Sequence, residues 1–189
     1  MMIQTERTGS IIVRLTIMMI ILCGLIYPVV MTGIAQTAVP NKANGSLIYS
    51  NNHQVIGSKL IGQQFTSNAF FHGRVSSIDY NGAGSGSLNL APSNKDLTNR
   101  IEKSVAAWKK ENEVPKEGIP IDAVTNSASG LDPDITPQAA YAQVERVAKA
   151  AHIKTNTLKE LIKEHTQQGA FGGKRVNVVE LNLAVQRER

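Results

Sequence analysis

The sequence has one cysteine, few aromatic residues and no dense run of charge. Cys23 is the only cysteine among 189 residues, so an internal disulfide is excluded. Aromatic residues make up 5% of the chain, and the formal net charge is only +5. Nucleic-acid binding needs a basic face, commonly with interleaved aromatics, and the sequence contains no such stretch. We therefore expect no nucleic-acid partner.

The histidines and glycines form no motif of a metal or phosphate site. The four histidines lack the H-x-x-x-H and H-E-x-x-H spacings, and no cysteine pair assists them. The glycine-rich stretch "NGAGSGSLN" has neither the lysine nor the directly following helix of a phosphate-binding loop. We therefore expect no metal, no catalytic residue and no cofactor of the chain's own, and we do not expect it to be an enzyme by itself.

Residues 124–134, "VTNSASGLDPD", raise the question of a serine nucleophile. Ser127 or Ser129 would be the nucleophile, with Asp132 as its helper. Neither serine lies in the G-x-S-x-G turn that exposes such a nucleophile, and neither begins an S-x-x-K motif. An envelope enzyme or interaction module on a signal anchor, using the Ser127/Ser129 segment, is the alternative function.

A long apolar run lies near the N-terminus. No charged side chain occurs from Leu15 to Asn41. A helix of about 20 apolar residues covers the hydrocarbon core of a bilayer, so residues 15–35 are predicted to span a membrane. A cleaved signal peptide is the alternative, but its apolar region is usually only about 7 to 15 residues long. The segment "GIAQTAVP" also offers no clean A-x-A cleavage site, which favours a retained anchor.

Three residues of the span predict how it packs. Pro28 lacks a backbone N–H, so we expect it to kink the helix or to mark a contact. Gly24 and Gly33 allow a neighbouring helix to approach closely. We therefore expect the single span to pack against other membrane helices.

The basic residues that flank the span predict its orientation. Arg7, Arg14 and the amino terminus precede it, whereas Lys42 alone follows closely, so the N-terminus is expected in the cytoplasm. The predicted division is a cytoplasmic segment at 1–14, a transmembrane helix at 15–35, a connector at 36–46 and an exported domain at 47–189.

The exported part is predicted to be one α+β domain, so the fold class is a single N-terminal transmembrane helix followed by a mixed α/β soluble domain. A helix is expected from Ser93, because Ser93 and Asp96 have the spacing of a capping box. Residues 119–125 are expected to be extended. Residues 175–185 alternate apolar and polar side chains, which is typical of a strand with one buried face. Its apolar positions are Val179, Leu181, Leu183 and Val185.

A helical hairpin is predicted between these segments. Thr136 has the character of a cap and is followed by Pro137 at the first helical position. A second helix is expected to begin near Thr155, with Thr157 and Glu160 as another capping box. The residues expected to face the core are Ala140, Val144, Val147, Ala148, Ala151, Leu158, Leu161 and Ile162.

Several blocks, taken together and in order, resemble one family. They include "YPVVMTGIAQ", "GSKLIGQQF", "FFHGRVSSIDYN", "IPIDAVTNSASGLDPDITPQAAYAQVERVAKA" and "RVNVVELNLAV". The chain resembles, over nearly its whole length, the C subunit of the Kdp-type potassium-transporting ATPase (the KdpC family). Val75 stands where a proline usually follows the arginine, and "SGSLNLAPSN" replaces the commoner "SGGSNLGPSN". Both departures are in loops.

The resemblance implies an accessory subunit of an ATP-driven, high-affinity potassium import complex in the bacterial inner membrane. It implies two partners, a channel-like A subunit and a P-type B subunit that binds nucleotide. The family is also described as a catalytic chaperone that raises the ATP affinity of the B subunit in a ternary complex, with a nucleotide-contacting glutamine that matches Gln143 here. We expect instead that the domain is periplasmic and docks on the ion-conducting subunit, where Gln143 does not meet cytosolic ATP.

Overall fold

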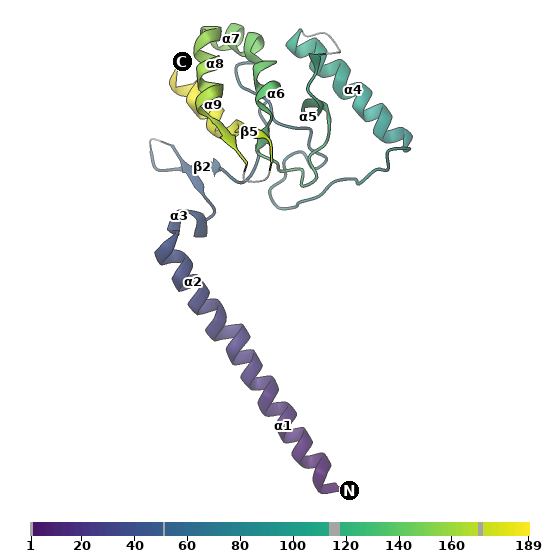
Figure 1. The fold of residues 1–189 in the computed structure, drawn as a ribbon, viewed down its shortest axis with the longest axis vertical. Coiled ribbons are helices and arrows are strands. Elements are labelled where there is room, and N and C mark those ends of the chain that lie inside the picture. Colours follow the sequence, from purple (N-terminus) through teal and green to yellow (C-terminus); the bar gives the residue numbers. More distant parts are fainter. Residues whose placement is uncertain (1, 51, 114–117, 170–171) are drawn as a thin grey trace. The chain divides into compact units, whose positions relative to one another are not determined.

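The structure is a computed structural model that describes residues 2–50, 52–113, 118–169 and 172–189. The chain divides into two compact units, Met1–Ser46 and Leu47–Arg189 (Figure 1).

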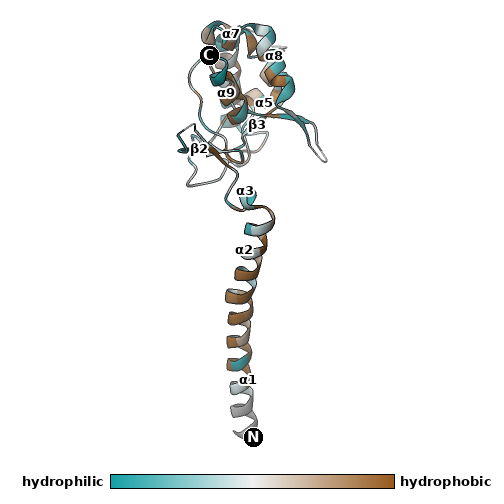
Figure 2. Cartoon of the chain, turned by 90° about the vertical axis from the view of Figure 1, so that its left-hand side faces the viewer, coloured by the Kyte–Doolittle hydropathy of each residue, from teal (hydrophilic) through white to brown (hydrophobic). Residues whose placement is uncertain are grey.

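The first unit is a helix with a short helical turn after it. The helix consists of α1 (Met2–Ile21), the π-helical segment η1 (Leu22–Ile26) and α2 (Tyr27–Ala38), and α3 (Pro40–Ala43) follows. Within its stretch Thr8–Ala38, an 18-residue window has a mean hydropathy of 2.3 and contains no buried residue, so the helix is long and apolar enough to cross a membrane. Figure 2 shows this hydrophobic colouring along the helix. The apolar helix is confirmed, and it is longer than the predicted 15–35.

The π-helical segment ends at Ile26, two residues before Pro28. The N–H of Tyr27 donates to the carbonyl of Leu22, five residues earlier, which is the wider spacing of a π-turn. A proline lacks an N–H, and its ring crowds the carbonyl four residues earlier, here that of Gly24. The disturbance of the helix expected at Pro28 therefore takes the form of one wide turn.

The second unit contains two small antiparallel sheets. The strands β1 (Leu47–Tyr49) and β2 (Val55–Ser58) form a hairpin. The other sheet has the order β3-β5-β4, with β5 (Lys174–Asn177) between β3 (Asp134–Ile135) and β4 (Thr166–Gln168). The mixture of these strands with helices confirms the α+β class.

Four helices enclose the main core of this unit. They are α6 (Pro137–Tyr141), α7 (Val144–Ala151), α8 (Thr155–Glu164) and α9 (Val178–Arg187). The largest buried side chains of the core are Phe71, Val144, Val147, Leu158, Ile162, Val176, Val178, Leu181 and Val185. The predicted inward face of the helical hairpin is thus confirmed.

Thr136 is the N-cap of α6, as predicted. Its Oγ1 accepts a hydrogen bond from the N–H of Ala139 at 3.1 Å, and Pro137 occupies the first turn. The capping box predicted at Thr157 and Glu160 is wrong. Helix α8 already begins at Thr155 after Lys154, so Thr157 lies inside its first turn.

A second, smaller cluster joins α4 (Lys95–Asn112) and α5 (Ile121–Val124) through Trp108, Ala123 and Val124. Two predictions here are wrong. The N-cap of α4 is Asn94, whose side chain accepts from the N–H of Asp96 at 2.7 Å, whereas Ser93 was the expected cap. Residues 121–124 are helical rather than extended, and the Asp122 carboxylate anchors this turn by accepting from Thr136.

The predicted C-terminal strand is also wrong beyond Asn177. Only Lys174–Asn177 is a strand, and α9 begins at Val178. The Asn177 side chain caps α9 by accepting from the N–H of Glu180 at 3.1 Å. The buried positions Val178, Leu181, Asn182 and Val185 follow helical spacing, because tertiary packing favours this face over the alternating one.

Candidate functional site

Gln143 lies at the N-cap position of α7 with 1% of its surface exposed. Its Oε1 accepts from the backbone N–H of His72 at 2.7 Å and from Nη2 of Arg146 at 2.7 Å. Its Nε2 donates to the carbonyls of His72 and Ala139, both at 3.1 Å. An amide side chain has two donor hydrogens and two acceptor positions, so these four bonds use all of them.

Arg146, one helical turn after Gln143, extends this network to two further segments. Its Nε donates to Oδ1 of Asn112 at 2.9 Å, which ties α7 to the end of α4. Its Nη1 donates to the carbonyls of Asn68 and Phe70 at 2.8 and 3.0 Å. Burial lowers the pKa of Arg146, and the Glu111 charge opposes that shift. The guanidinium therefore joins α4, α7 and the loop at residues 68–70.

His72 connects the same loop to α4. Its Nδ1 lies 2.9 Å from Oε1 of Glu111, and its Nε2 lies 3.1 Å from the carbonyl oxygen of Ser67. Burial and the Arg146 charge lower the pKa of His72, whereas Glu111 and the Ser67 carbonyl raise it, and the lowering effects win. Since a neutral imidazole has one N–H, it can donate to only one of these two oxygens.

An open cleft of about 790 Å³ lies beside this network, between the end of α4 and the α7–α8 turn. Its charged lining is mixed, with Glu111, Glu113 and Glu145 on the acidic side and Arg146, Lys149 and Lys154 on the basic side. The polar atoms of Gln143 are not among those that line it. Among the described residues the charged lining of the cleft is therefore balanced and not of one sign.

Ser127 and Ser129 shape the loop before β3. The buried Oγ of Ser127 accepts from the N–H groups of Gly130 and Asp132 at 3.1 and 3.3 Å, and it lies 3.2 Å from Oγ of Ser129. Ser129 in turn accepts from the N–H of Leu131 at 3.1 Å. Both hydroxyls thus hold backbone groups of their own loop.

Asp132 pairs with Arg74, not with a serine hydroxyl. Oδ2 of Asp132 lies 3.0 Å from Nη1 of Arg74, and Oδ1 accepts from the N–H of Asp134 at 3.0 Å. Among the described residues neither serine hydroxyl bonds a histidine or lysine that would act as its base. The segment therefore has the geometry of an ordered turn.

The remaining histidines lie elsewhere. His152 is the exposed left-handed C-cap of α7, and Nδ1 of His165 lies 2.8 Å from the carbonyl of Leu161 at the end of α8. Within the described parts of the chain, no group of three or more His, Cys, Asp or Glu side chains is arranged to hold a metal ion.

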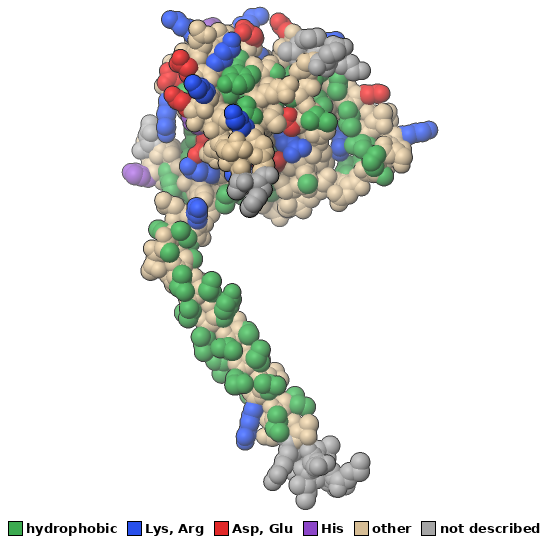
Figure 3. Space-filling model, viewed as in Figure 1, with side chains coloured by type: hydrophobic (Ala, Val, Ile, Leu, Met, Phe, Trp, Pro, Cys, Tyr) green, Lys and Arg blue, Asp and Glu red, His purple; other side chains and the backbone are tan. Residues whose placement is uncertain are grey.

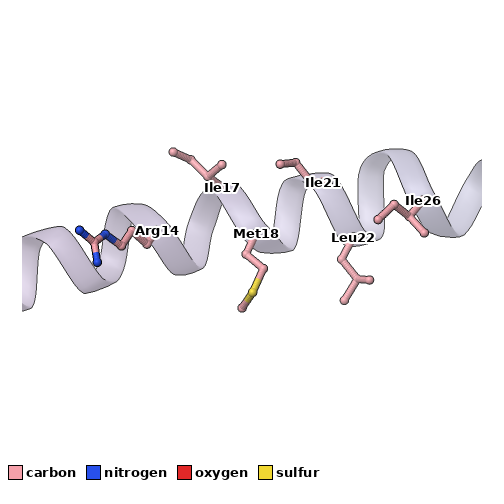
Figure 4. Close-up of a pocket in the computed structure, with 6 residues that line it drawn as sticks. All are labelled: Arg14, Ile17, Met18, Ile21, Leu22 and Ile26. Carbon is pink, nitrogen blue, oxygen red and sulfur yellow. The ribbon is translucent and has the colours of Figure 1, made fainter.

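The helix of the first unit exposes large apolar side chains along its length. Figure 3 shows hydrophobic side chains along the helix. Six residues at helical spacing line a shallow groove (Figure 4): Arg14, Ile17, Met18, Ile21, Leu22 and Ile26. A Cβ added at Gly24 or Gly33 would meet no atom within 4 Å, so the chain's own fold does not require glycine at either position.

Comparison with known proteins decides the family. A family model described as "K+-transporting ATPase, c chain" matches residues 10–187, which is nearly the whole chain. The chain belongs to the KdpC family. It is 56% identical over 190 residues to the potassium-transporting ATPase KdpC subunit of Bacillus cereus (strain Q1), with 98% of each chain covered.

Other KdpC relatives match this chain over the same length. The KdpC subunit of Bacillus anthracis (strain CDC 684 / NRRL 3495) is 56% identical, and that of Bacillus thuringiensis subsp. konkukian (strain 97-27) is 53% identical, again with 98% of each chain covered. The KdpC match therefore includes both the apolar helix and the second unit. The family predicted from the sequence blocks is confirmed.

Neither His72 nor Arg146 was predicted from the sequence as a partner of Gln143. Arg146 lies three residues after Gln143, so their shared helix face offers a local signal. His72 lies 71 positions away, and no local pattern connects it to Gln143. Arg74, the partner of Asp132, was missed for the same reason.

Proposed function

We propose that the chain is the accessory C subunit of an ATP-driven, high-affinity potassium import complex, and that it assembles and stabilises this complex without catalysis of its own. The observation that carries the proposal is the family match over both units, including a helix whose apolar side chains are not buried within its own unit. Such a helix gains partners only from lipid or from other membrane helices. Gly24 and Gly33 suit close helix contact.

Two partners are proposed, the channel-like A subunit and the P-type B subunit of the same complex. The test is purification in detergent through a tag on this chain. Two larger membrane proteins are expected to co-purify, and deletion of the chain is expected to abolish growth at limiting potassium. A tagged chain that supports such growth and yet purifies alone would contradict the proposal.

We also propose that the N-terminus is cytoplasmic and that the second unit lies on the outer side of the plasma membrane. Arg7 and Arg14 precede the span, whereas Lys42 follows it, and an excess of basic residues favours the cytoplasmic side. Alkaline phosphatase fused after Arg189 is expected to be active. Fluorescence of a cytosol-only reporter at the same position, without phosphatase activity, would refute this placement.

For the effect on ATP affinity, we propose an indirect route. The Gln143 amide has its four hydrogen-bonding positions occupied inside the domain, which supports a structural role over a nucleotide contact. Coupling between distant sites is usually about 1–3 kcal/mol, which is enough to change the affinity of the B subunit.

Gln143→Glu separates the two routes. A carboxylate keeps the pairing to Arg146 but cannot donate to the carbonyls of His72 and Ala139. Indirect action predicts that the domain loses stability while the KM for ATP of assembled complex stays within about twofold of the wild-type value. A KM that rises tenfold or more in a fully assembled, folded complex would support the direct contact.

A further inference from the structure

Most of the exposed large hydrophobic residues described in the second unit lie at its start, in residues 47–61. Among the described residues of this unit, nine large hydrophobic side chains are exposed, and six of them lie in this stretch. These six, which we call the hairpin patch, are Leu47, Tyr49, Val55, Ile56, Leu60 and Ile61. The other three, Leu88, Ile121 and Tyr141, are far apart in the sequence. Exposed apolar side chains that gather on one face are a feature of interaction sites, so the direction of each face of the hairpin matters.

The two faces of the hairpin differ. Ile56 lines a groove of the domain with Phe65, Phe70 and Val179, so its face of β2 is directed at the domain. Successive residues on a strand point to opposite faces, so Val55 points away from that groove. Tyr49 is the cross-strand partner of Val55. With exposures of 54% and 56%, this pair gives the hairpin an outward apolar face.

Chain connectivity limits how far this face lies from the end of the apolar helix. Helix α2 ends at Ala38 and β1 begins at Leu47. Nine steps of at most about 3.6 Å keep Leu47 within about 32 Å of the helix end, whatever the orientation of the two units. The hairpin patch is therefore held close to any membrane that the helix spans.

The charge around the patch suits an anionic lipid surface. No aspartate or glutamate occurs from Arg7 to Ile78, whereas Lys42 and Lys59 flank the hairpin. Lys59 also pairs with Glu180 of α9 and keeps 54% of its side chain exposed. Apolar side chains, a tyrosine and lysines together are the composition of interfacial segments, where rings and stems enter the headgroup region and lysines meet anionic lipid.

From these observations we infer that the β1–β2 hairpin is a second membrane contact, which inserts Tyr49 and Val55 into the headgroup region of an anionic bilayer. The inference rests on the proposed membrane span of the first unit. A hairpin held at the surface would fix the height and tilt of the second unit above the bilayer, a restraint that a single connector does not supply.

The test uses the full-length chain in vesicles of phosphatidylcholine and phosphatidylglycerol with nitroxide-labelled acyl chains. An environment-sensitive dye is attached at one cysteine at a time: the natural Cys23, Val55→Cys in a Cys23→Ser background, or Ile121→Cys in the same background. Ile121 is 77% exposed and is the matched apolar control. Shallow nitroxides are expected to quench the dye at position 55 about twofold and to leave position 121 unchanged.

Cys23 separates failure of this inference from failure of the proposed span. Quenching of Cys23 by deep nitroxides without quenching at position 55 would overturn the hairpin contact, leave the span intact and indicate a protein partner for the patch. Equal quenching at positions 55 and 121 would overturn it as nonspecific adsorption. No quenching at Cys23 would overturn the span, and the hairpin inference with it.

A second set of variants tests the patch itself. Tyr49→Ser is expected to abolish quenching at position 55, whereas the control Tyr141→Ser, at an exposed tyrosine elsewhere in the domain, is expected to preserve it. Quenching that survives Tyr49→Ser would also overturn the inference.

Discussion

The helix of residues 8–38 and the domain that begins at Leu47 use the same aliphatic side chains in opposite ways. In the helix, Leu25 exposes 60% of its surface and Ile17 exposes 52%. In the domain, Leu158 and Ile162 expose none. The domain therefore obtains its hydrophobic stabilisation from its own chain, whereas the helix needs lipid or other helices to cover it. Substitutions in the two regions should have effects of different kinds.

The largest effect is expected from a matched pair of leucines. Leu158→Ala should lower the free energy of unfolding of the domain by about 2–5 kcal/mol, because it leaves a cavity in the core. Leu25→Ala should leave that free energy unchanged. Urea unfolding of the full chain in detergent, followed by fluorescence of Trp108, the only tryptophan, measures both. Equal losses of unfolding free energy in the two variants would contradict the division between a domain that buries its own apolar side chains and a helix that does not.

The polar network within the domain should be the next most sensitive. Gln143→Ala leaves buried donors and acceptors of His72, Arg146 and Ala139 without partners, and each such group costs about 1–3 kcal/mol. Because water can enter the vacated space and partner some of these groups, we expect a total loss of about 3 kcal/mol in the same unfolding measurement. Gln138→Ala, on the exposed side of α6, is the control and should change stability by no more than about 0.5 kcal/mol. A stable Gln143→Ala domain would show that the network is dispensable.

The serine loop should respond more weakly. Ser127→Ala removes an acceptor for two backbone N–H groups and should cost about 1–2 kcal/mol of stability. Ser93→Ala, at an exposed loop position, should cost almost nothing. Growth at limiting potassium should be normal for Ser127→Ala at temperatures where the domain stays folded. Loss of growth in a variant of near wild-type stability would revive the enzyme hypothesis.

The smallest expected effect is a pH dependence from His72. Its pKa is lowered in the folded state by burial and by Arg146, so the unfolded chain binds more protons than the folded chain at mildly acidic pH. The stabilisation is complete above the unfolded pKa of about 6.5 and is lost as the pH falls through the folded pKa. Urea unfolding at pH 5 and pH 7.5 should reveal this slope.

Two histidine variants identify which residue causes this pH dependence of stability. His72→Gln should flatten it, whereas His152→Gln, at the exposed end of α7, should preserve it. If His152→Gln removes the pH dependence and His72→Gln does not, the assignment of this dependence to His72 is contradicted.

The sequence predicted those features that depend on local patterns. The apolar run, the Thr136 cap and the helical face of Val144, Val147 and Leu158 each follow from a few neighbouring residues. The strand prediction for the segment after Asn177 was wrong because its valines and leucines fit both an alternating and a helical pattern. Its choice depends on the Asn177 cap and on packing against the core.

The candidate site could be predicted only in part. The family resemblance drew attention to Gln143, but its contact with His72 joins residues 71 positions apart. Buried polar networks of this kind depend on the tertiary fold, which periodicity does not encode. The question of a serine nucleophile likewise could not be answered from the sequence. The hydrogen bonds of Ser127 and the pairing of Asp132 with Arg74 are visible only in the folded domain.

The central claim is that the uncovered helix joins this chain to a membrane complex. The most direct test replaces residues 8–38 with an unrelated apolar helix of the same length and measures which proteins co-purify through a tag at Arg189. We predict that the altered chain reaches the membrane with a folded domain but loses the two larger subunits and growth at limiting potassium. Retention of both subunits would contradict the claim and assign assembly to the domain alone.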